Sequence, residues 1–414
     1  MMDSRTTAHP AWLTSRRLRA HGLILALCFW CAYAWNLSSP GLLDRHHNVK
    51  GTDFLHFYTL GSLAREHRGA QLYAMEAQAT LTQERVPQVR RVRFVPLYGP
   101  QVSLFFAPLS MLPYSQALLL WLVLNAAIYA LCCYVVWKTC PNLQSESMLV
   151  FILALAYPGF FHLLAWGQSS GLALACFTAA YLALRSQRFF LAGLALGCLV
   201  FKPQLGLASA FVILGAGEWT IVLGALLAAM AQLSVGWLYY GTPVMRDYFY
   251  HLVHVRSVFS QLEPRPYQMH SLRSFWAMLI PWPHLAFAVY VITAVAALGI
   301  ALYCWRARAP LNLRFGALLI ATVLVSPHLT VYDLVILVPA YLLLADWVVA
   351  DGRPSPRNLG MLLYLGYALP LLGPLSIWTH LQLSVPARAG ILWMIFRIAE
   401  TRAEAISEPL AAKL

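Results

Sequence analysis

The chain has 414 residues, of which 60% are hydrophobic and only 11% are charged, and its mean hydropathy is +0.63. A typical globular domain has about 25% charged residues, so this composition excludes an ordinary soluble protein and predicts a polytopic membrane protein. The formal net charge of +13 does not indicate nucleic-acid binding, because the basic residues are spread over loops and form no basic helix. Membrane topology and an anionic lipid-linked partner explain this charge better.

The first apolar run lies near residues 20–37 and follows Arg16, Arg17 and Arg19. No small-residue cleavage site follows it, so we interpret it as a retained membrane helix with its basic flank in the cytoplasm. We expect residues 1–19 to be a cytoplasmic tail, residues 20–400 to form one transmembrane domain, and residues 401–414 to be a second cytoplasmic tail.

A long polar segment at about 38–100 follows the first helix and is predicted to lie outside the cytoplasm as a helical loop. The sequence GTDF at its start precedes the helical pattern LHFYTLGSLAREH. Near its end, VSLFFAPLSMLPY is short and interrupted by proline, and we expect an interfacial or re-entrant element there.

The remaining apolar runs predict about 10–12 membrane helices in total. Three short loops predicted to be cytoplasmic are basic, as the positive-inside rule requires. Two runs on either side of Lys202 have only about 13 residues each and predict a broken or shallow hairpin. We expect residues 241–272 to form an aromatic and basic outer loop.

This topology places polar residues from distant parts of the chain at the same membrane face. They are Asp53, Gln168, Lys202, His328 and Asp333. A cluster of polar groups at one membrane surface is what an interfacial active site needs, so these residues are our first candidates.

Asp53 is flanked by Phe54, His56 and other aromatic residues, and partial desolvation should raise the pKa of its carboxyl group. Such a carboxylate can accept a proton from a sugar hydroxyl. A helix N-cap is the structural alternative for Asp53, and the residue type alone does not decide between the two.

Lys202 ends an apolar run before a proline, where it either reaches the lipid headgroups or binds a phosphate as a point charge. The imidazole of His328, in SPHLTVYD, could hydrogen-bond a phosphate or a sugar, although lone histidines are more often structural. Asp333 either orients His328 or caps the following helix.

Eight basic residues make the first outer segment positive, and their guanidinium and ammonium groups fit an anionic ligand or, alternatively, anionic lipid headgroups. They are Arg45, Lys50, Arg65, Arg68, Arg85, Arg90, Arg91 and Arg93. The sequence contains no GxxxxGK[ST], no strand-linked GxGxxG and no HExxH, so it predicts neither a soluble nucleotide-binding fold nor a metal site.

Four segments together resemble one family. They are Asp53 with the run to LGSLAREHRGAQLY, then PLYGPQVSLFFAPLSMLPY, then WGQSS through to FKPQLGL, and SPHLTVYDLVILVPAYLLL. This pattern, over about residues 45–345, is similar to the glycosyltransferase family 87 proteins of the GT-C superfamily, many of which are α-mannosyltransferases. The block usually read as Tyr-Pro-Pro in the family is Tyr98, Gly99 and Pro100 here.

The resemblance implies a GT-C type membrane domain that inverts the anomeric carbon as it moves a hexose from a polyprenyl phosphate to a lipid- or glycan-linked hydroxyl. It implies that Asp53 is the catalytic base and that His328 and Lys202 contact the donor phosphate. Gln168, Tyr98, His56, Arg65 and Asp333 complete the set that we expect to bind substrate. A phosphate leaves as an anion, so no metal or other cofactor is required in principle.

The expected location is a bacterial inner or plasma membrane, with the active site facing the periplasm or exterior. A transporter or flippase of a lipid-linked saccharide is the main alternative. It would place polar groups near the bilayer midplane and show repeat symmetry, which the sequence lacks. A non-catalytic partner in a cell-envelope complex is a third possibility, and it predicts that Asp53→Asn is harmless.

Overall fold

The computed structural model describes residues 14–89, 92–255, 262–263, 265–351 and 354–411. In these ranges the chain is mostly helical, and extended backbone pairs only at two isolated bridges, Leu43 with Val49 and Met269 with Thr330. The prediction of an all-α polytopic protein is confirmed. Arg90, Arg91, Arg353 and most of the N-terminal tail lie outside the described residues.

Six helical segments in the described ranges are long and apolar enough to cross a membrane. They are α1 (Ser15–Leu37), α5 (Tyr114–Trp137), α11 (Trp219–Val253), α14 (Pro283–Arg306), η7 with α16 (Val331–Leu337 and Val338–Asp351), and α17 with η8 and α18 (Pro354–Ala368, Leu369–Leu375 and Ser376–Thr379). The first helix therefore begins earlier than expected and includes the basic residues before its apolar run.

Shorter apolar helices supply the rest of the membrane domain. The bent pair of η3 with α6 (Pro141–Glu146 and Ser147–Leu155) and α7 (Pro158–Trp166) changes direction by 44°. Four more are α8 (Ser170–Arg185), α9 with η4 (Phe189–Gly197 and Cys198–Phe201), α10 (Pro203–Gly215) and α15 (Leu311–Val325). A total of 10–12 membrane helices requires these shorter helices to cross as well, and that count stays a prediction.

The first polar segment folds into α2 (Thr52–Arg65), η1 (Gly69–Gln71) and α3 (Met75–Arg85), so the expectation that it is helical is confirmed. Next come α4 (Pro100–Phe106) and η2 (Leu109–Met111), short helices that pack against α2. The remaining elements are η6 (Pro266–Gln268), α13 (Leu272–Leu279) and α19 (Ser384–Ala411).

One expected loop is wrong in its first half. Residues 241–253 are helical, because α11 continues across a single break at Gly241, where φ is 80° and ψ is 176°. Pro243 follows this break as one of the first residues of the second half, where its missing N–H leaves no hydrogen bond unmade. The aromatic and basic composition of the segment suggested a loop, but these residues belong to the second half of α11.

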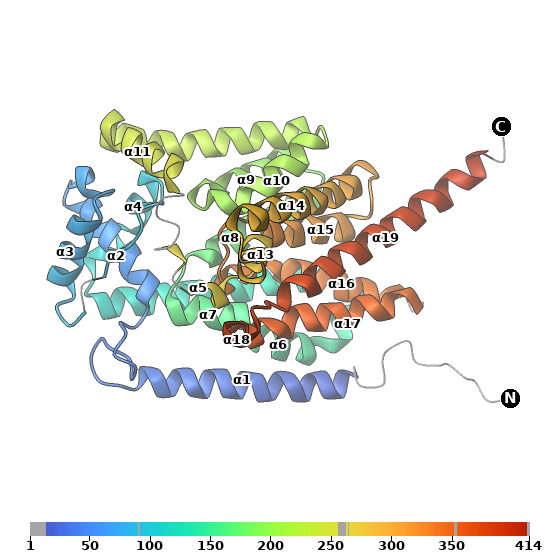
Figure 1. Ribbon diagram of the computed structural model, residues 1–414, viewed down its shortest axis with the longest axis horizontal. Helices are drawn as coiled ribbons and strands as arrows, with labels where there is room; N and C mark the ends of the chain where they lie inside the picture. Colours follow the sequence, from blue (N-terminus) through green and yellow to red (C-terminus); the bar gives the residue numbers. More distant parts are fainter. Residues whose placement is uncertain (1–13, 90–91, 256–261, 264, 352–353, 412–414) are drawn as a thin grey trace.

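The two ends of the helix bundle contain different elements (Figure 1). α1 and α11 run along opposite edges, both chain termini lie at one end, and α2, α3 and α4 gather at the other. We call the end with α2, α3 and α4 the distal end. An ion pair of 2.6 Å between Arg19 and Glu146 joins the start of α1 to the connection before α6, at the end with the termini.

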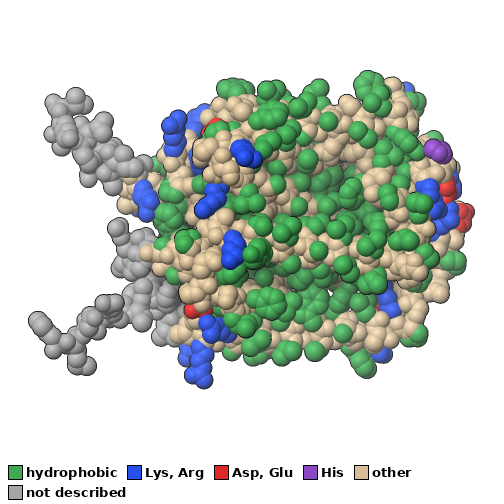
Figure 2. Space-filling view, turned by 180° about the vertical axis from the view of Figure 1, so that it is seen from behind, with side chains coloured by type: hydrophobic (Ala, Val, Ile, Leu, Met, Phe, Trp, Pro, Cys, Tyr) green, Lys and Arg blue, Asp and Glu red, His purple; other side chains and the backbone are tan. Residues whose placement is uncertain are grey.

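Hydrophobic side chains cover the middle of the molecule, whereas lysine and arginine side chains gather toward its two ends (Figure 2). Large apolar residues such as Leu131, Leu238 and Ile292 are exposed on the surface of the protein. An exposed apolar belt between charged ends is the surface that a lipid bilayer requires.

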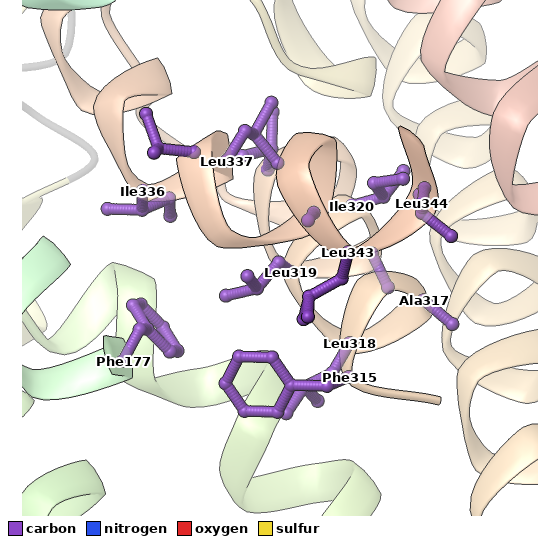
Figure 3. Close-up of a cluster of buried hydrophobic side chains, with 14 of the residues drawn as sticks. Phe177, Phe315, Ala317, Leu318, Leu319, Ile320, Ile336, Leu337, Leu343 and Leu344 are labelled. Atoms are coloured by element: carbon purple, nitrogen blue, oxygen red, sulfur yellow. The ribbon is translucent and has the colours of Figure 1, made fainter. Parts of the chain in front are cut away.

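α15 forms the centre of the hydrophobic core, and its residues from Phe315 to Val325 are all buried. Figure 3 shows side chains of α15 between those of η7, α16 and Phe177 of α8. A helix that is apolar on every side is expected to be buried on every side. α15 packs against α10, which begins just after Lys202, and against η7, which carries Asp333.

Glycines bring α9 and α11 into close contact. A Cβ atom added to Gly193 would lie 3.0 Å from the backbone nitrogen of Ala225, and one added to Gly224 would lie 2.9 Å from that of Leu194. Small residues allow helices in a membrane to approach closely and gain van der Waals contact. Gly299 of α14 differs, because a Cβ there would meet nothing within 4 Å.

We expect Gly193→Ala to destabilise the protein by about 1–3 kcal/mol, the usual effect of overpacking a tight contact. Gly299→Ala is the matched control and should leave stability unchanged or raise it by up to about 1 kcal/mol, because alanine favours the helix. Thermal unfolding of both variants in the same detergent measures the difference. Equal unfolding midpoints for the two variants would contradict the close contact of α9 and α11.

Candidate functional site

A cavity of about 1020 Å³ lies among α1, α2, α7, the start of α10, and the segments around 92–98, 262–269 and 327–333. The structure brings seven of the eight candidate residues to its wall. They are Asp53, His56, Tyr98, Gln168, Lys202, His328 and Asp333. Residues that are up to 280 positions apart thus share one space beside the distal end, as the expected topology requires.

Asp53 stands in the first turn of α2 but does not cap the helix. The N-cap residue is Gly51, in the left-handed conformation with φ of 69°, and no side chain caps the helix. The N-cap alternative for Asp53 is therefore wrong, and its carboxylate is free to face the cavity. Burial raises the pKa of Asp53 to about 6, against the lowering effects of Gln168, Lys202 and His328.

Gln168 holds the carboxylate of Asp53 by donating from Nε2 to Oδ2 over 2.9 Å. Its orientation is fixed because its Oε1 accepts a hydrogen bond of 2.7 Å from the backbone nitrogen of Ser169, so the NH₂ group must face Asp53. Gly167, at φ of 66°, ends α7 and turns the chain toward the cavity. Gln168 thus positions the carboxylate and stabilises its ionised form.

Lys202 and Asp333 form a buried ion pair of 2.8 Å, and each side chain is at most 3% exposed. Ser170 Oγ joins them: it donates to Asp333 Oδ1 over 2.6 Å and accepts from Lys202 Nζ over 2.8 Å. Because Lys202 is buried and paired, the alternative that it reaches the lipid headgroups is wrong. Its positive charge is matched by a carboxylate.

The second oxygen of Asp333 closes a capping box with Thr330, whose backbone nitrogen donates to Oδ2 over 3.2 Å. Of the two alternatives for Asp333, helix capping is therefore the one that the structure shows. No hydrogen bond joins Asp333 to His328 in the described part of the chain, where Nδ1 of His328 instead contacts Glu263.

His328 lies on the cavity wall and its Nδ1 is 3.1 Å from Oε1 of Glu263. The same glutamate accepts a hydrogen bond of 2.7 Å from Arg273, which also donates to the carbonyl of Pro327. With Nδ1 engaged by Glu263, Nε2 is the ring nitrogen left for a ligand. Glu263 was not found by sequence analysis, because it lies in a segment without helical periodicity.

Aromatic rings surround the part of the cavity next to Asp53. The ring of His56 stacks on Phe94 at 4.6 Å between centroids, and the hydroxyl of Tyr98 donates to Gln168 Oε1 over 3.4 Å. Burial lowers the pKa of His56 to about 3, so this ring is neutral at physiological pH. Burial and the nearby Asp53 raise the pKa of Tyr98 above its ordinary value, so its hydroxyl stays protonated.

Arg65 is the one candidate that the structure does not bring to the cavity. Its guanidinium donates to the carbonyl of Ser110 over 2.9 Å and lies near Glu66. Glu66 also pairs with Arg68 and Arg85, so these arginines of the distal end have a protein partner. Among the described residues of the 85–93 region, only Val92 and Arg93 line the cavity.

Breaking the buried ion pair should destabilise the protein, because it leaves an unpaired carboxylate in the interior. We expect Lys202→Met to lower the free energy of unfolding by about 3–5 kcal/mol. The double variant with Asp333→Leu should lose less than Lys202→Met alone, because it removes both charges.

Denaturant unfolding in detergent micelles measures these effects, with Lys138→Met as the control. Lys138 is exposed and lies over the rings of Tyr134 and Trp137, so its loss should change stability by less than about 1 kcal/mol. A Lys202→Met protein that unfolds like the wild type would contradict the pair.

One family model matches the chain, that of glycosyltransferase family 87, over residues 97–327. This range is more than half of the chain and includes Tyr98, Gln168 and Lys202 of the cavity. No curated protein and no solved structure matches the chain. With its apolar helices and belt, the protein is a multi-pass membrane protein, and the chain belongs to glycosyltransferase family 87.

Proposed function

We propose that this membrane glycosyltransferase moves a hexose, mannose in the first instance, from a polyprenyl-phosphate donor to a lipid- or glycan-linked hydroxyl. The site would face the exterior or the periplasm of a bacterial plasma membrane. The observation that carries the proposal is a carboxylate with a raised pKa, held by Gln168, in a cavity that also contains Lys202 and His328. The choice of mannose rests on the family resemblance alone.

Access from the lipid supports a lipid-linked donor. Leu207 of α10 lines the cavity and is 59% exposed. Tyr33 and Leu37 of α1 line the cavity from another edge of the helix bundle. A polyprenyl chain could therefore remain in the hydrocarbon region while its phosphate and sugar enter the polar cavity.

In the proposed reaction, the hydroxyl oxygen of the acceptor attacks the anomeric carbon from the side of Asp53. Asp53 takes the hydroxyl proton as the new carbon–oxygen bond forms. The bond between the anomeric carbon and the phosphate oxygen breaks, and its electron pair leaves with the polyprenyl phosphate. The phosphate departs on the side of His328 and Lys202, where hydrogen-bond donors stabilise the growing negative charge.

Attack on one face of the sugar and departure from the opposite face would make the reaction inverting. Attack and departure occur along one line through the anomeric carbon, so a single displacement inverts its configuration. This arrangement requires the base and the phosphate site to lie on opposite sides of the sugar. Asp53 at the start of α2 and His328 after α15 belong to different elements of the cavity lining, which fits this assignment.

Asp53→Asn should lower the transfer rate by about 10²–10⁴, the usual contribution of a general base. The purified protein is incubated with polyprenyl-phosphate mannose and cell-envelope lipids, and the product is followed by mass spectrometry. Asp247→Asn is the matched control, because Asp247 lies on α11 and outside the cavity lining. Equal product from Asp53→Asn and wild type would remove the base assignment, and transfer from a nucleotide sugar would overturn the donor class.

The rate should also depend on pH, because only the ionised carboxylate accepts a proton. With a pKa of about 6 for Asp53, kcat/KM should fall tenfold per unit as the pH drops below about 6 and level off above it. Gln168→Ala removes a hydrogen bond that lowers this pKa, so its inflection should move to higher pH. An inflection that stays in place in Gln168→Ala would contradict the role of Gln168.

A further inference from the structure

Within the described ranges, four lysine and arginine residues line the cavity, and they differ in the groups that their side chains contact. Lys202 is paired with Asp333 at 2.8 Å, and Arg93 with Glu76 at 2.5 Å. Lys50 donates from Nζ to the carbonyls of Ser39 and Gly41, at 2.6 and 2.9 Å. The fourth cation is Arg265.

Arg265 has no carboxylate at ion-pair distance within the described residues, and it is exposed to the cavity that it lines. It stands just before η6, and its guanidinium lies over the ring of Trp166, 6.0 Å from the centroid. An aromatic face attracts a guanidinium without neutralising it. Trp166 therefore supports the side chain while its charge and hydrogen-bond donors stay available.

The donor phosphate of the proposed reaction needs such a cation. A phosphodiester carries one negative charge, and cleavage of the bond to the sugar adds another on the polyprenyl phosphate that leaves. Lys202 cannot match this extra charge alone, because Asp333 already neutralises it, and the imidazole of His328 is paired with Glu263. Among the described cations of the cavity wall, Arg265 is therefore the one whose guanidinium has neither a carboxylate nor a carbonyl partner.

We propose that Arg265, supported on Trp166, binds the phosphate of the polyprenyl donor and stabilises it as it leaves. This inference rests on the proposed function. The guanidinium presents paired N–H donors that match two phosphate oxygens, which an ammonium group cannot do. The charges that act on Asp53 come from Lys202, Asp333 and His328, and Arg265 is not among them.

The position of Arg265 also connects the phosphate to the base. Trp166 precedes Gly167 and Gln168, and Gln168 holds Asp53. One short turn after α7 therefore supports the proposed phosphate ligand through its tryptophan and the base through its glutamine. The separation between phosphate and base is then fixed by this turn.

Binding of a short-chain polyprenyl phosphate, the product of the donor, tests the proposal directly. The full-length protein is placed in phosphatidylcholine nanodiscs, and Kd is measured for wild type, Arg265→Ala, Arg265→Lys and Arg246→Ala. We expect Arg265→Ala to weaken binding by at least about tenfold, the loss of a charge-assisted hydrogen bond. Arg265→Lys should recover part of this loss, because it restores the charge without the fork.

Arg246 is the control, because it is exposed on α11 and does not line the cavity. Its substitution should leave Kd within about twofold of wild type. In turnover, Arg265→Ala should raise KM for the donor and lower kcat, with KM for the acceptor unchanged. A purely structural effect would instead lower the unfolding midpoint and change both KM values together.

The outcomes separate the two proposals. A wild-type protein that neither binds polyprenyl phosphate nor uses its mannosyl ester overturns the proposed donor class, and this inference with it. A wild type that binds, together with an Arg265→Ala protein that binds equally well, overturns the role of Arg265 alone. Nanodiscs with phosphatidylglycerol distinguish a headgroup site: loss of phosphatidylglycerol binding in Arg265→Ala, without loss of polyprenyl phosphate binding, also overturns this role.

Discussion

The hydrogen-bonded group of Lys202, Asp333 and Ser170 determines how the rest of the site is built. Ser170 and Asp333 are 163 positions apart, and their contact fixes the start of α8 against η7. Lys202 adds the junction between η4 and α10, and the other oxygen of Asp333 fixes the turn that begins η7. Removing Lys202 or Asp333 leaves the other charge buried and unpaired, which costs more than the bond itself contributes. The buried polar groups of this part of the cavity wall therefore satisfy one another.

Charge compensation around the cavity allows a carboxylate to act as a base there. The charge of Lys202 lowers the pKa of Asp53 and so weakens the carboxylate as a proton acceptor. Asp333 reduces that field, and it is itself among the charges that raise the pKa of Asp53. Glu263 lies beside His328, with 3.1 Å between Oε1 and Nδ1. The site thus combines several cations with a base whose ionisation lies within reach of physiological pH.

The sequence predicted the helical class and the grouping of residues at one face, because both follow from helix ends. Gln168, Lys202 and His328 each come just after a helix breaks, and counting the crossings assigns these breaks to one side. It failed where position within an element mattered: Arg65 shares α2 with Asp53, but twelve residues of helix separate them by about 18 Å. Glu263 and Arg265 had no periodic signal, and the small side chain of Ser170 did not indicate an ion-pair partner.

Gly241 shows how one backbone position shapes the chamber. Its dihedral angles, φ of 80° and ψ of 176°, belong to a region that only glycine enters without strain. Beyond it, the second half of α11 carries Leu252 to the cavity wall, with Val255 just after the helix. The direction of this half-helix is set at Gly241, because any other amino acid would be strained in this backbone conformation. A change in the size of this wall for another acceptor therefore has to come from the side chains of residues 242–255.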